Sequence, residues 1–446
     1  MRAWNPPVAG SLRGPVVAVV AAVASLVVAL AGVLASPASA ASSSTVSSVG
    51  ERAGGAGTWT GAWGSGLVRP TAPQPWSWPN WAWEGFADQS LRQVVRSGAE
   101  GSQLRVRLSN QYGHGPLRLT RATVARAAEG ASALPGTVRE LRFSGRAEAV
   151  VPTGEDLLSD ALRLPVRPLE RLAVTLYFAG ATGPVGFHED GLATAYRAAG
   201  DRTQDTAGDA FGGATSESHY LLAGVEVRGA RTEGGVVAFG DSLTDGWGST
   251  PGTDRRYPDR LAERLLADGR RLAVVNAGIS GNQLLTDSPC YGDRALDRFR
   301  RDVLDRPGVR TAVVLIGIND IGASGLPDWG CGSTLAVTAG QVIEGHRALI
   351  RAAHRRGVTV IGATLTPFRG YAAYHSPQKE RVRDAVNRWI RTSGAYDAVA
   401  DLDRVLADPR PGHRTELAPA YDSGDGLHPN DAGTAAMAEA VADLVP

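Results

Sequence analysis

The stretch VVAFGDSLTDG, residues 236–246, decides the fold of the second half of this chain. Four apolar residues rich in β formers run directly into Gly-Asp-Ser, and a helical pattern begins about ten residues later. This order predicts a buried parallel strand that ends in a tight turn, with Ser242 at its carboxyl end. Ligands bind at that end of the strands in open α/β sheets, so Ser242 would face a site. An ordinary turn is the alternative, because Ser and Asp are both common in turns.

Strand-like and helix-like segments alternate from this stretch to the C-terminus. The expected strands are residues 236–239, 272–276, 311–317, 358–365 and 398–402. The expected helices lie near residues 257–267, 295–304, 335–356, 378–391 and 430–444. The fourth of these helices would be capped by Ser376, with Pro377 at its first position. Five strands with intervening helices predict a parallel, doubly wound sheet.

The preceding region, residues 58–230, shows a different pattern of short alternating runs. In residues 104–108, Leu, Val and Leu alternate with arginine, so the apolar side chains would point to one face. Similar runs occupy residues 117–124, 138–143, 147–151, 161–164, 172–178, 194–197 and 220–227. They predict an antiparallel, jelly-roll-like β-sandwich, joined by a short linker to the α/β domain at residues 234–446. A scaffold is the expected role, and a polysaccharide-binding module is the alternative.

Tryptophan is concentrated at the start of this region, within residues 58–86. Of the ten tryptophans in the chain, six lie there: Trp59, Trp63, Trp76, Trp78, Trp81 and Trp83. Prolines at positions 70, 73, 75 and 79 predict a loop rather than a regular element. Packing of the domain, or covering of a cleft, is the favoured role for these side chains. A carbohydrate platform or a lipid interface is the alternative, because large aromatic side chains suit both.

The N-terminus has the pattern of a secretory signal. Two arginines within residues 1–13 precede an Ala/Val/Leu run over residues 14–34, and Ala38-Ser39-Ala40 follows. These segments predict a signal peptide, residues 1–40, that is cleaved near Ala40 and directs secretion. Residues 41–57 would form a disordered linker, and no other stretch is apolar for long enough to span a bilayer. A retained membrane anchor is the alternative.

Charge and cysteine content narrow the function further. The net charge is +1, and no basic excess points to a nucleic-acid partner. Export would place the two cysteines, Cys290 and Cys331, in an oxidising compartment, which favours a disulfide over two free thiols. A two-cysteine metal site is not expected, because companion ligands at suitable spacing are lacking. No cofactor is expected.

Four loops bring chemically useful residues to one edge of the predicted sheet. Ser242 follows the first strand, a glycine turn at 278–282 follows the second, Asn319 follows the third, and Asp425 and His428 precede the last helix. Parallel topology places these loops at the same rim, although they are far apart in sequence. A serine nucleophile needs a base, which His428 can be near neutral pH, and Asp425 can hold the other imidazole nitrogen.

The same rim also offers donors for the negative charge of a tetrahedral intermediate. The backbone N–H groups of Ser242 and Gly281 and the side-chain amide of Asn319 could donate to that oxygen. Each residue also has an ordinary explanation, as a turn glycine, a strand-end turn or a helix-capping side chain. All of these explanations would have to hold together at one rim, which favours acyl transfer.

The residues of the four loops resemble a known family. Gly240-Asp241-Ser242-Leu243, Gly281 in Ile-Ser-Gly-Asn, Gly317-x-Asn319-Asp320 and Asp425-x-x-His428 are similar, in order, to the four blocks of the SGNH (GDSL) hydrolases. The resemblance covers about residues 234–446 and implies a three-layer α/β/α fold without a metal. It also implies a Ser242 nucleophile, a His428 base, an Asp425 partner, and an oxyanion hole formed by Ser242, Gly281 and Asn319. Residues 91–95 and 105–110 look like the β-domain that precedes the hydrolase in some secreted actinobacterial members. In this frame, a Cys290–Cys331 bridge would tie two oxyanion-hole loops together.

These observations predict a secreted serine esterase that cleaves carboxylic esters through an acyl-enzyme, with water as the second acceptor. The substrate would be a small or polymer-linked ester, from either carbohydrate O-acetyl groups or lipid and short-chain acyl esters. The alternative is a polysaccharide- or cell-wall-binding protein with a vestigial hydrolase fold. The complete set of Ser, Gly, Asn and His at the rim speaks against that alternative.

Overall fold

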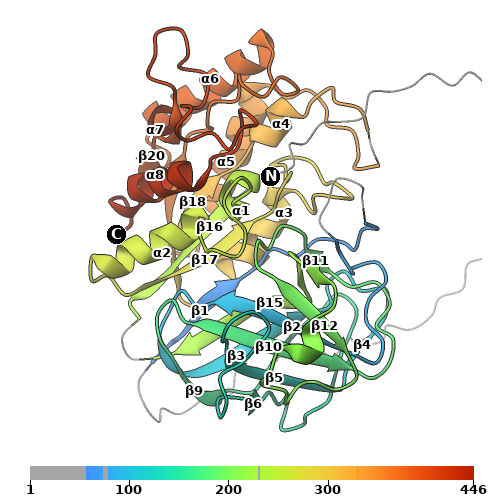
Figure 1. Ribbon diagram of the computed structural model, residues 1–446. Coiled ribbons are helices and arrows are strands. Elements are labelled where there is room, and N and C mark those ends of the chain that lie inside the picture. The colour runs from blue at the N-terminus through green and yellow to red at the C-terminus, as the bar shows by residue number, and fades with distance from the viewer. Residues whose placement is uncertain (1–56, 74–78, 230–231, 329) are drawn as a thin grey trace, which may run out of the picture. The chain divides into compact units, whose positions relative to one another are not determined.

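A computed structural model describes residues 57–73, 79–229, 232–328 and 330–446 (Figure 1). The expected signal peptide, residues 1–40, lies outside the described residues, as do residues 41–56 of the expected linker and both Trp76 and Trp78. Within the described ranges, no helix combines the length and the apolar character needed to cross a membrane.

The second half of the chain forms the expected parallel sheet of five strands, whose order is β17-β16-β18-β19-β20. Its strands are β16 (Gly234–Gly240), β17 (Leu272–Gly278), β18 (Val309–Leu315), β19 (Thr359–Ala363) and β20 (Ala398–Ala400). Every residue of β16 is buried, since β16 lies between β17 and β18 and is covered on both faces. The third strand ends two residues earlier than expected, because a short helix begins directly after Gly317, which has a φ of 114°.

Two groups of helices cover this sheet and complete a three-layer α/β/α domain. One group contains α2 (Tyr257–Ala267), α7 (Leu402–Leu406) and α8 (Asp431–Ala442). The other contains α3 (Ala295–Phe299), α4 (Ile318–Gly322), α5 (Ala339–His354) and α6 (Pro377–Thr392). Ser376 caps α6 as expected, and its hydroxyl accepts a hydrogen bond from the backbone N–H of Lys379.

Two of the expected helices differ from the structure. The helix expected at 335–356 begins only at Ala339, because Thr338 and Gln341 form a capping box that fixes the start. The helix expected at 295–304 changes after α3 into a π-helical turn, η2 (Arg300–Leu304). The short helices α1 (Ser242–Asp245), α4 and α7 were not expected, since four or five residues carry no detectable periodicity.

The first half is an antiparallel β-sandwich, which we call the β domain. One sheet has the order β1-β15-β3-β8 with β9 beside β3, and the other has the order β13-β12-β2-β10-β5-β6. The bounds are β1 (Trp59–Gly64), β2 (Gln89–Arg96), β3 (Gly101–Ser109), β5 (Arg121–Arg126), β6 (Arg139–Glu140), β8 (Asp156–Leu158), β9 (Leu162–Val166), β10 (Arg171–Phe178), β12 (Ala195–Ala199), β13 (Thr215–Ser216) and β15 (Leu222–Arg228). Two strand pairs stand apart: β4 (Leu117–Leu119) with β7 (Ala149–Val151), and β11 (Phe187–His188) with β14 (His219–Tyr220). Leu104, Val106 and Leu108 of β3 point into the shared core, as their alternation predicts.

The tryptophan-rich segment is not wholly a loop, contrary to the sequence prediction. Residues 59–64 form β1, which pairs with β15, because the prolines that break regular structure begin only at Pro70. Trp63 and Trp81 are buried in the sandwich core, as a packing role requires. Trp83 is 52% exposed and is the tryptophan that keeps a large free surface among the described residues.

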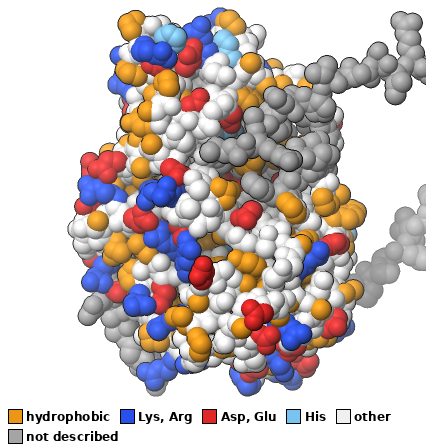
Figure 2. Space-filling view, in the orientation of Figure 1, with side chains coloured by type: hydrophobic (Ala, Val, Ile, Leu, Met, Phe, Trp, Pro, Cys, Tyr) orange, Lys and Arg blue, Asp and Glu red, His pale blue; other side chains and the backbone are white. Residues whose placement is uncertain are grey.

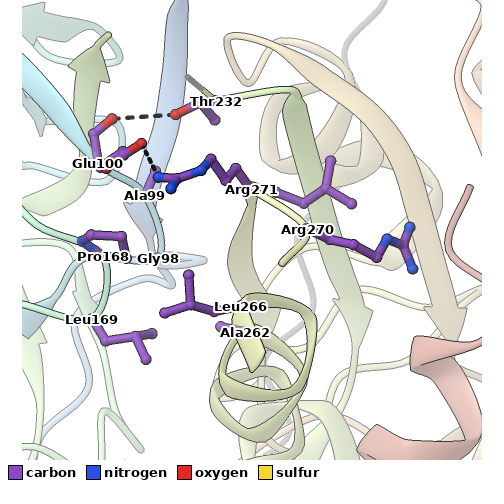
Figure 3. A pocket seen from close by; sticks show the side chains of 11 residues that line it. Gly98, Ala99, Glu100, Pro168, Leu169, Thr232, Ala262, Leu266, Arg270 and Arg271 are labelled. Carbon is purple, nitrogen blue, oxygen red and sulfur yellow. Dashed lines mark hydrogen bonds and ion pairs between the residues drawn. The ribbon is translucent and has the colours of Figure 1, made fainter. Parts of the chain in front are cut away.

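The two domains meet along an extensive seam beside β17. Ala273 and Ile279, from β17 and the loop after it, belong to the apolar core of the β domain. The buried guanidinium of Arg306 donates to the backbone carbonyls of Ser65 and Ala223. At one edge of the seam, shown in Figure 3, Arg271 forms an ion pair with Glu100 across the domains. The β domain therefore packs directly against the strand that leads to the second rim loop.

The surface shows no gathering of one charge on the face drawn in Figure 2. On that face, the described Lys and Arg side chains are interspersed with Asp and Glu. This mixture agrees with the small net charge of +1.

Candidate active site

Ser242 is the first residue of α1, at the carboxyl end of the buried strand β16. The turn is fixed by Asp241, whose Oδ1 accepts a hydrogen bond of 3.1 Å from the backbone N–H of Leu243. Gly246 ends α1 in the left-handed region, with a φ of 112°. This strand–turn–helix arrangement leaves Ser242 only 7% exposed, at the rim where the other three loops converge.

His428 and Asp425 form a continuous chain of hydrogen bonds with Ser242. The Oγ of Ser242 lies 2.9 Å from Nε2 of His428, and Nδ1 of His428 lies 2.6 Å from Oδ2 of Asp425. With the imidazole proton on Nδ1, the serine hydroxyl donates to Nε2 and the carboxylate accepts from Nδ1. The structure therefore brings together three residues that are separated by up to 186 positions in sequence.

Asp425 is held in its ionised form by its surroundings. Its Oδ1 accepts from the backbone N–H groups of Leu427 and His428, at 2.9 and 2.8 Å. Burial alone would raise the pKa of Asp425, but the hydrogen bond and charge of His428 and these N–H groups outweigh it and lower the pKa to about 2. Asp425 is thus a carboxylate at neutral pH, as an imidazole-orienting group must be.

The second rim loop presents Gly281 with a φ of 73°, a conformation that favours glycine. A Cβ at this position would lie 2.4 Å from the ring of Tyr291, so the close approach of that ring also requires glycine. The backbone N–H of Ile279 donates to the carbonyl of Gly240, which joins this loop to the strand end before Ser242. Within the described residues, the backbone N–H groups of Ser242 and Gly281 have no hydrogen-bond acceptor.

Asn319 lies in α4 and contacts the same loop. Its Nδ2 donates to the backbone carbonyl of Asn282 at 2.9 Å, and its Oδ1 accepts from the hydroxyl of Tyr374 at 2.8 Å. These two contacts fix which end of the amide is the donor. Nδ2 carries a second hydrogen, for which the described residues show no acceptor.

The disulfide expected between Cys290 and Cys331 is present. It joins the segment after Gly281 to the segment after Asn319, and the hydroxyl of Ser288 adds a hydrogen bond of 2.6 Å to the backbone carbonyl of Cys331. The two segments that bear oxyanion-hole candidates are therefore linked covalently.

Two residues that shape this site have long-range partners that the sequence did not reveal. Arg298 is fully buried under the rim and donates to the backbone carbonyls of Gly240 and Ala277 and to the side chain of Asn282. Asp320, next to Asn319, accepts from the backbone N–H groups of Leu284 and Leu285, and burial raises its pKa to about 6. Its place in an Asn-Asp pair after a strand was visible, but its long-range partners were not.

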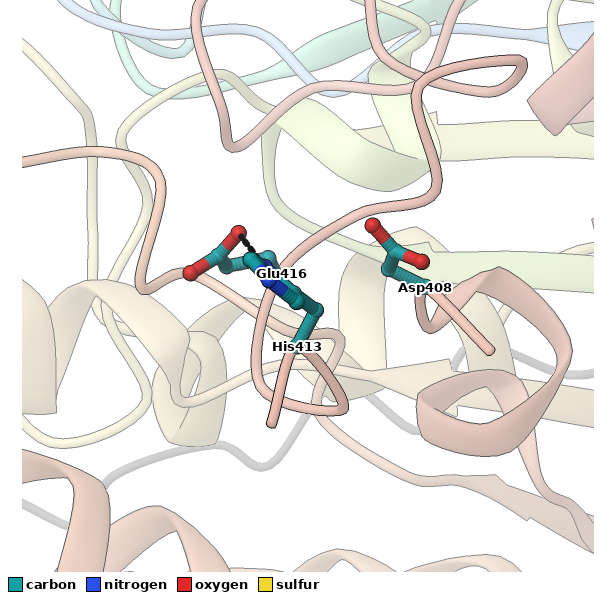
Figure 4. A group of neighbouring side chains, drawn as sticks. All are labelled: Asp408, His413 and Glu416. Atoms are coloured by element: carbon teal, nitrogen blue, oxygen red, sulfur yellow. Dashed lines mark hydrogen bonds and ion pairs between the residues drawn. The ribbon is translucent and has the colours of Figure 1, made fainter. Parts of the chain in front are cut away.

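One group of three described side chains has the residue types of a metal site. Asp408, His413 and Glu416 offer ligand atoms within 4.8 Å of one another (Figure 4). However, Nδ1 of His413 is already hydrogen-bonded to Glu416 at 2.9 Å, and both oxygens of Asp408 accept from Arg410. These pairings satisfy the ligand atoms within the chain, so we assign no metal to the group.

A parallel α/β sheet with a serine, a histidine and an aspartate joined at its rim has the architecture of a hydrolase. Residues 238–436 match the model of the GDSL-like lipase/acylhydrolase family. This part of the chain is therefore similar to that family, and the match supports a hydrolase that acts on esters.

Solved structures with a similar α/β domain include three hydrolases. The lipase/acylhydrolase from Enterococcus faecalis is 20% identical, with 47% of this chain and 94% of that chain covered and a TM-score of 0.36. An acetyl xylan esterase variant from Geobacillus stearothermophilus is 21% identical, with coverages of 47% and 93% and a TM-score of 0.36. An α/β hydrolase from the metagenome of Lake Arreo, Spain, is 22% identical, with coverages of 47% and 94% and a TM-score of 0.35. No curated protein matches the chain in sequence.

Proposed function

We propose that this protein is an exported serine esterase that cleaves carboxylic esters through an acyl-enzyme. The observation that carries the proposal is the chain of hydrogen bonds from the Oγ of Ser242 through His428 to Asp425. This arrangement supplies a nucleophile, a base and a group that orients the base. The family of the α/β domain supports an ester as the substrate, and the N-terminal signal pattern supports export.

In the first half of the reaction, the Oγ of Ser242 attacks the ester carbonyl while Nε2 of His428 takes its proton. The carbonyl oxygen becomes an oxyanion, which the N–H groups of Ser242 and Gly281 and the Nδ2 of Asn319 would stabilise. One such donor is typically worth about 3–4 kcal/mol. Collapse of the intermediate breaks the ester C–O bond, and His428 gives its proton to the leaving alcohol. In the second half, water replaces the alcohol and releases the acid.

The proposal is tested by replacing the nucleophile. We expect Ser242→Ala to abolish hydrolysis of p-nitrophenyl acetate and labelling by a fluorophosphonate, with an unchanged circular dichroism spectrum. Ser393→Ala, at the exposed end of α6, should keep full activity and full labelling. Wild-type activity in Ser242→Ala would refute the proposal. A folded wild-type protein without activity that binds an insoluble polysaccharide would favour the binding-protein alternative.

Two substrate classes follow from the proposal: carbohydrate O-acetyl groups, and lipid or short-chain acyl esters. A series of p-nitrophenyl esters of increasing chain length, run beside acetylated xylan and a phospholipid, separates them. A carbohydrate esterase should lose kcat/KM steeply beyond the acetyl ester and release acetate from xylan. A lipase should instead keep or gain kcat/KM with chain length.

A further inference from the structure

His188, on β11 of the β domain, contacts the helix that carries the candidate nucleophile. Its Nε2 lies 2.9 Å from Oδ1 of Asp245, the last residue of α1, and its Nδ1 lies 2.8 Å from the backbone carbonyl of Gly66. The side chains of His188 and Asp245 are only 5% and 1% exposed. A carbonyl and a carboxylate can only accept hydrogen bonds, so both ring nitrogens of His188 donate and the ring is an imidazolium.

Several buried titratable groups surround this pair. Burial lowers the pKa of His188, but the charge and hydrogen bond of Asp245 outweigh it and leave the pKa above its ordinary value. Burial and the nearby Glu189 raise the pKa of Asp190 well above its ordinary value. Burial also keeps His219, which stacks at 6.4 Å from His188, in its neutral form with a strongly lowered pKa.

The second oxygen of Asp245 reaches the second rim loop. Oδ2 accepts from the backbone N–H of Ser280 at 3.0 Å and from its hydroxyl at 3.2 Å. Asn276, on the strand that leads to this loop, donates from its side chain to the backbone carbonyl of Asp245 at 3.2 Å and so links β17 to α1. Ser280 directly precedes Gly281, and the peptide bond between them carries the N–H that would donate to the oxyanion.

We propose that His188 is a positioning residue for ester hydrolysis, which acts through Asp245 to fix the Ser280–Gly281 peptide of the oxyanion hole. The proposal rests on the proposed function. It assigns the β domain a direct part in turnover, in place of the scaffold role that its sequence indicates, because the contact crosses from one domain to the other. Without His188, Oδ1 of the buried Asp245 would lose its hydrogen-bond donor, and the loop that Asp245 holds would shift.

A shift of this loop should lower kcat and leave KM nearly unchanged. The oxyanion forms only after attack, so its donors stabilise the transition state more than the bound ester. Misplacement of a reacting geometry by about 1 Å costs on the order of 100-fold in rate. We therefore expect a loss of about 10- to 100-fold in kcat when the contact between His188 and Asp245 is removed.

Two amide substitutions at His188 separate positioning from simple packing. In His188→Gln, the amide nitrogen takes the place of Nε2 and can still donate to Asp245. In His188→Asn, the shorter amide takes the place of Nδ1, so it can reach Gly66 and not Asp245. We expect His188→Gln to retain kcat within about threefold and His188→Asn to lose about 10- to 100-fold, although both remove the ring. His354→Asn is the matched control, since Nε2 of His354 lies 2.9 Å from Asp397 in an exposed pair.

The measurement is steady-state hydrolysis of p-nitrophenyl acetate, with kcat expressed per site labelled to completion by a fluorophosphonate and thermal unfolding run in parallel. Equal kcat in His188→Asn and wild type, or equal losses in the Asn and Gln variants, would overturn the positioning role and leave the esterase proposal intact. A wild type without esterase activity would overturn both. If His188→Asn does not fold, Ser280→Ala carries the test, since it removes one of the two donors to Oδ2 of Asp245. It should lower kcat about threefold at constant KM, and an unchanged kcat would overturn the positioning role.

Discussion

Two histidine–aspartate pairs contact the candidate nucleophile or its helix, and they differ in what faces the second ring nitrogen. In His428–Asp425, Nδ1 meets the carboxylate at 2.6 Å and Nε2 faces the hydroxyl of Ser242. In His188–Asp245, Nε2 meets the carboxylate at 2.9 Å and Nδ1 faces a backbone carbonyl. A hydroxyl can donate a proton to imidazole, whereas a carbonyl can only accept one.

This difference assigns different chemistry to the same two residue types. Nε2 of His428 faces the hydroxyl of Ser242 and is placed to take its proton, and its pair is partly exposed, at 13% and 30%. His188 must carry both protons, and its pair is almost completely buried. The first pair is therefore suited to proton transfer and the second to holding backbone in place. The second partner of the imidazole, more than the carboxylate, separates the two roles.

The largest expected effect is the loss of the proton-transferring pair. We expect His428→Ala to lower kcat for p-nitrophenyl acetate by about 10⁴- to 10⁶-fold, because no other base faces Ser242 among the described residues. Removal of the contact between His188 and Asp245 should lower kcat by no more than about 100-fold. His354→Ala serves as the control for the general effect of removing a histidine. A similar loss in His428→Ala and His188→Asn would contradict the distinction between the two pairs.

The next largest effect is expected at Asn319, the oxyanion-hole candidate that contacts neither histidine. We expect Asn319→Ala to lower kcat by a few hundredfold, because one oxyanion donor is lost while nucleophile and base remain. Tyr374→Phe is the matched variant, since it removes only the hydroxyl that orients the Asn319 amide. We expect Tyr374→Phe to lower kcat about tenfold. Steady-state kinetics with p-nitrophenyl acetate measures both, and a full rate in Asn319→Ala would remove this residue from the oxyanion hole.

Local sequence signals predicted the α/β fold and one of the two pairs. Ser242, Asp425 and His428 lie in loops that follow apolar strands or precede a capped helix, so topology alone brings them to one rim. His188 could not be found in this way, because its partner Asp245 belongs to another domain and their contact depends on how the domains pack. Packing between domains produces no periodic pattern or characteristic residue spacing that the sequence would reveal.

The same reasoning explains the secondary-structure errors. The proline count over residues 58–86 predicted a loop, but the strand at 59–64 precedes every proline and is fixed by its pairing with β15. The expected helix at 335–356 began four residues too early, since apolar periodicity extended past the capping box at Thr338. In both cases, a tertiary or capping interaction overrode the composition of a window.

A smaller effect is expected from the disulfide that links the loops of Gly281 and Asn319. Reduction of Cys290–Cys331 should lower kcat about two- to fivefold, because the donors lose one restraint while their hydrogen bonds persist. Esterase kinetics and thermal unfolding before and after dithiothreitol measure this. The double variant Cys290→Ser with Cys331→Ser is the control and should not respond to the reductant. A loss above 100-fold would mean that the disulfide, and not His188, holds the loop.

The smallest effect is expected in the pH dependence of the free energy of unfolding, and it arises at the buried carboxyl of Asp241. Oδ1 of Asp241 accepts from Leu243, and Oδ2 has no partner among the described residues. Burial raises the pKa of Asp241 from 3.8 to about 8. Between these values the folded protein keeps a proton that the unfolded chain releases, so stability falls as pH rises, by at most about 1.4 kcal/mol per pH unit.

Asp241→Asn removes this titration and keeps the acceptor for Leu243. Urea unfolding at pH 5 and pH 8 should therefore show a smaller loss of unfolding free energy in Asp241→Asn than in wild type. Asp397→Asn, at an exposed carboxyl, is the control and should keep the wild-type difference. Equal pH dependence in Asp241→Asn and wild type would mean that Asp241 is ionised in the fold. The buried Asp241 carboxylate would then be stabilised by a nearby positive charge, as Asp245 is by His188.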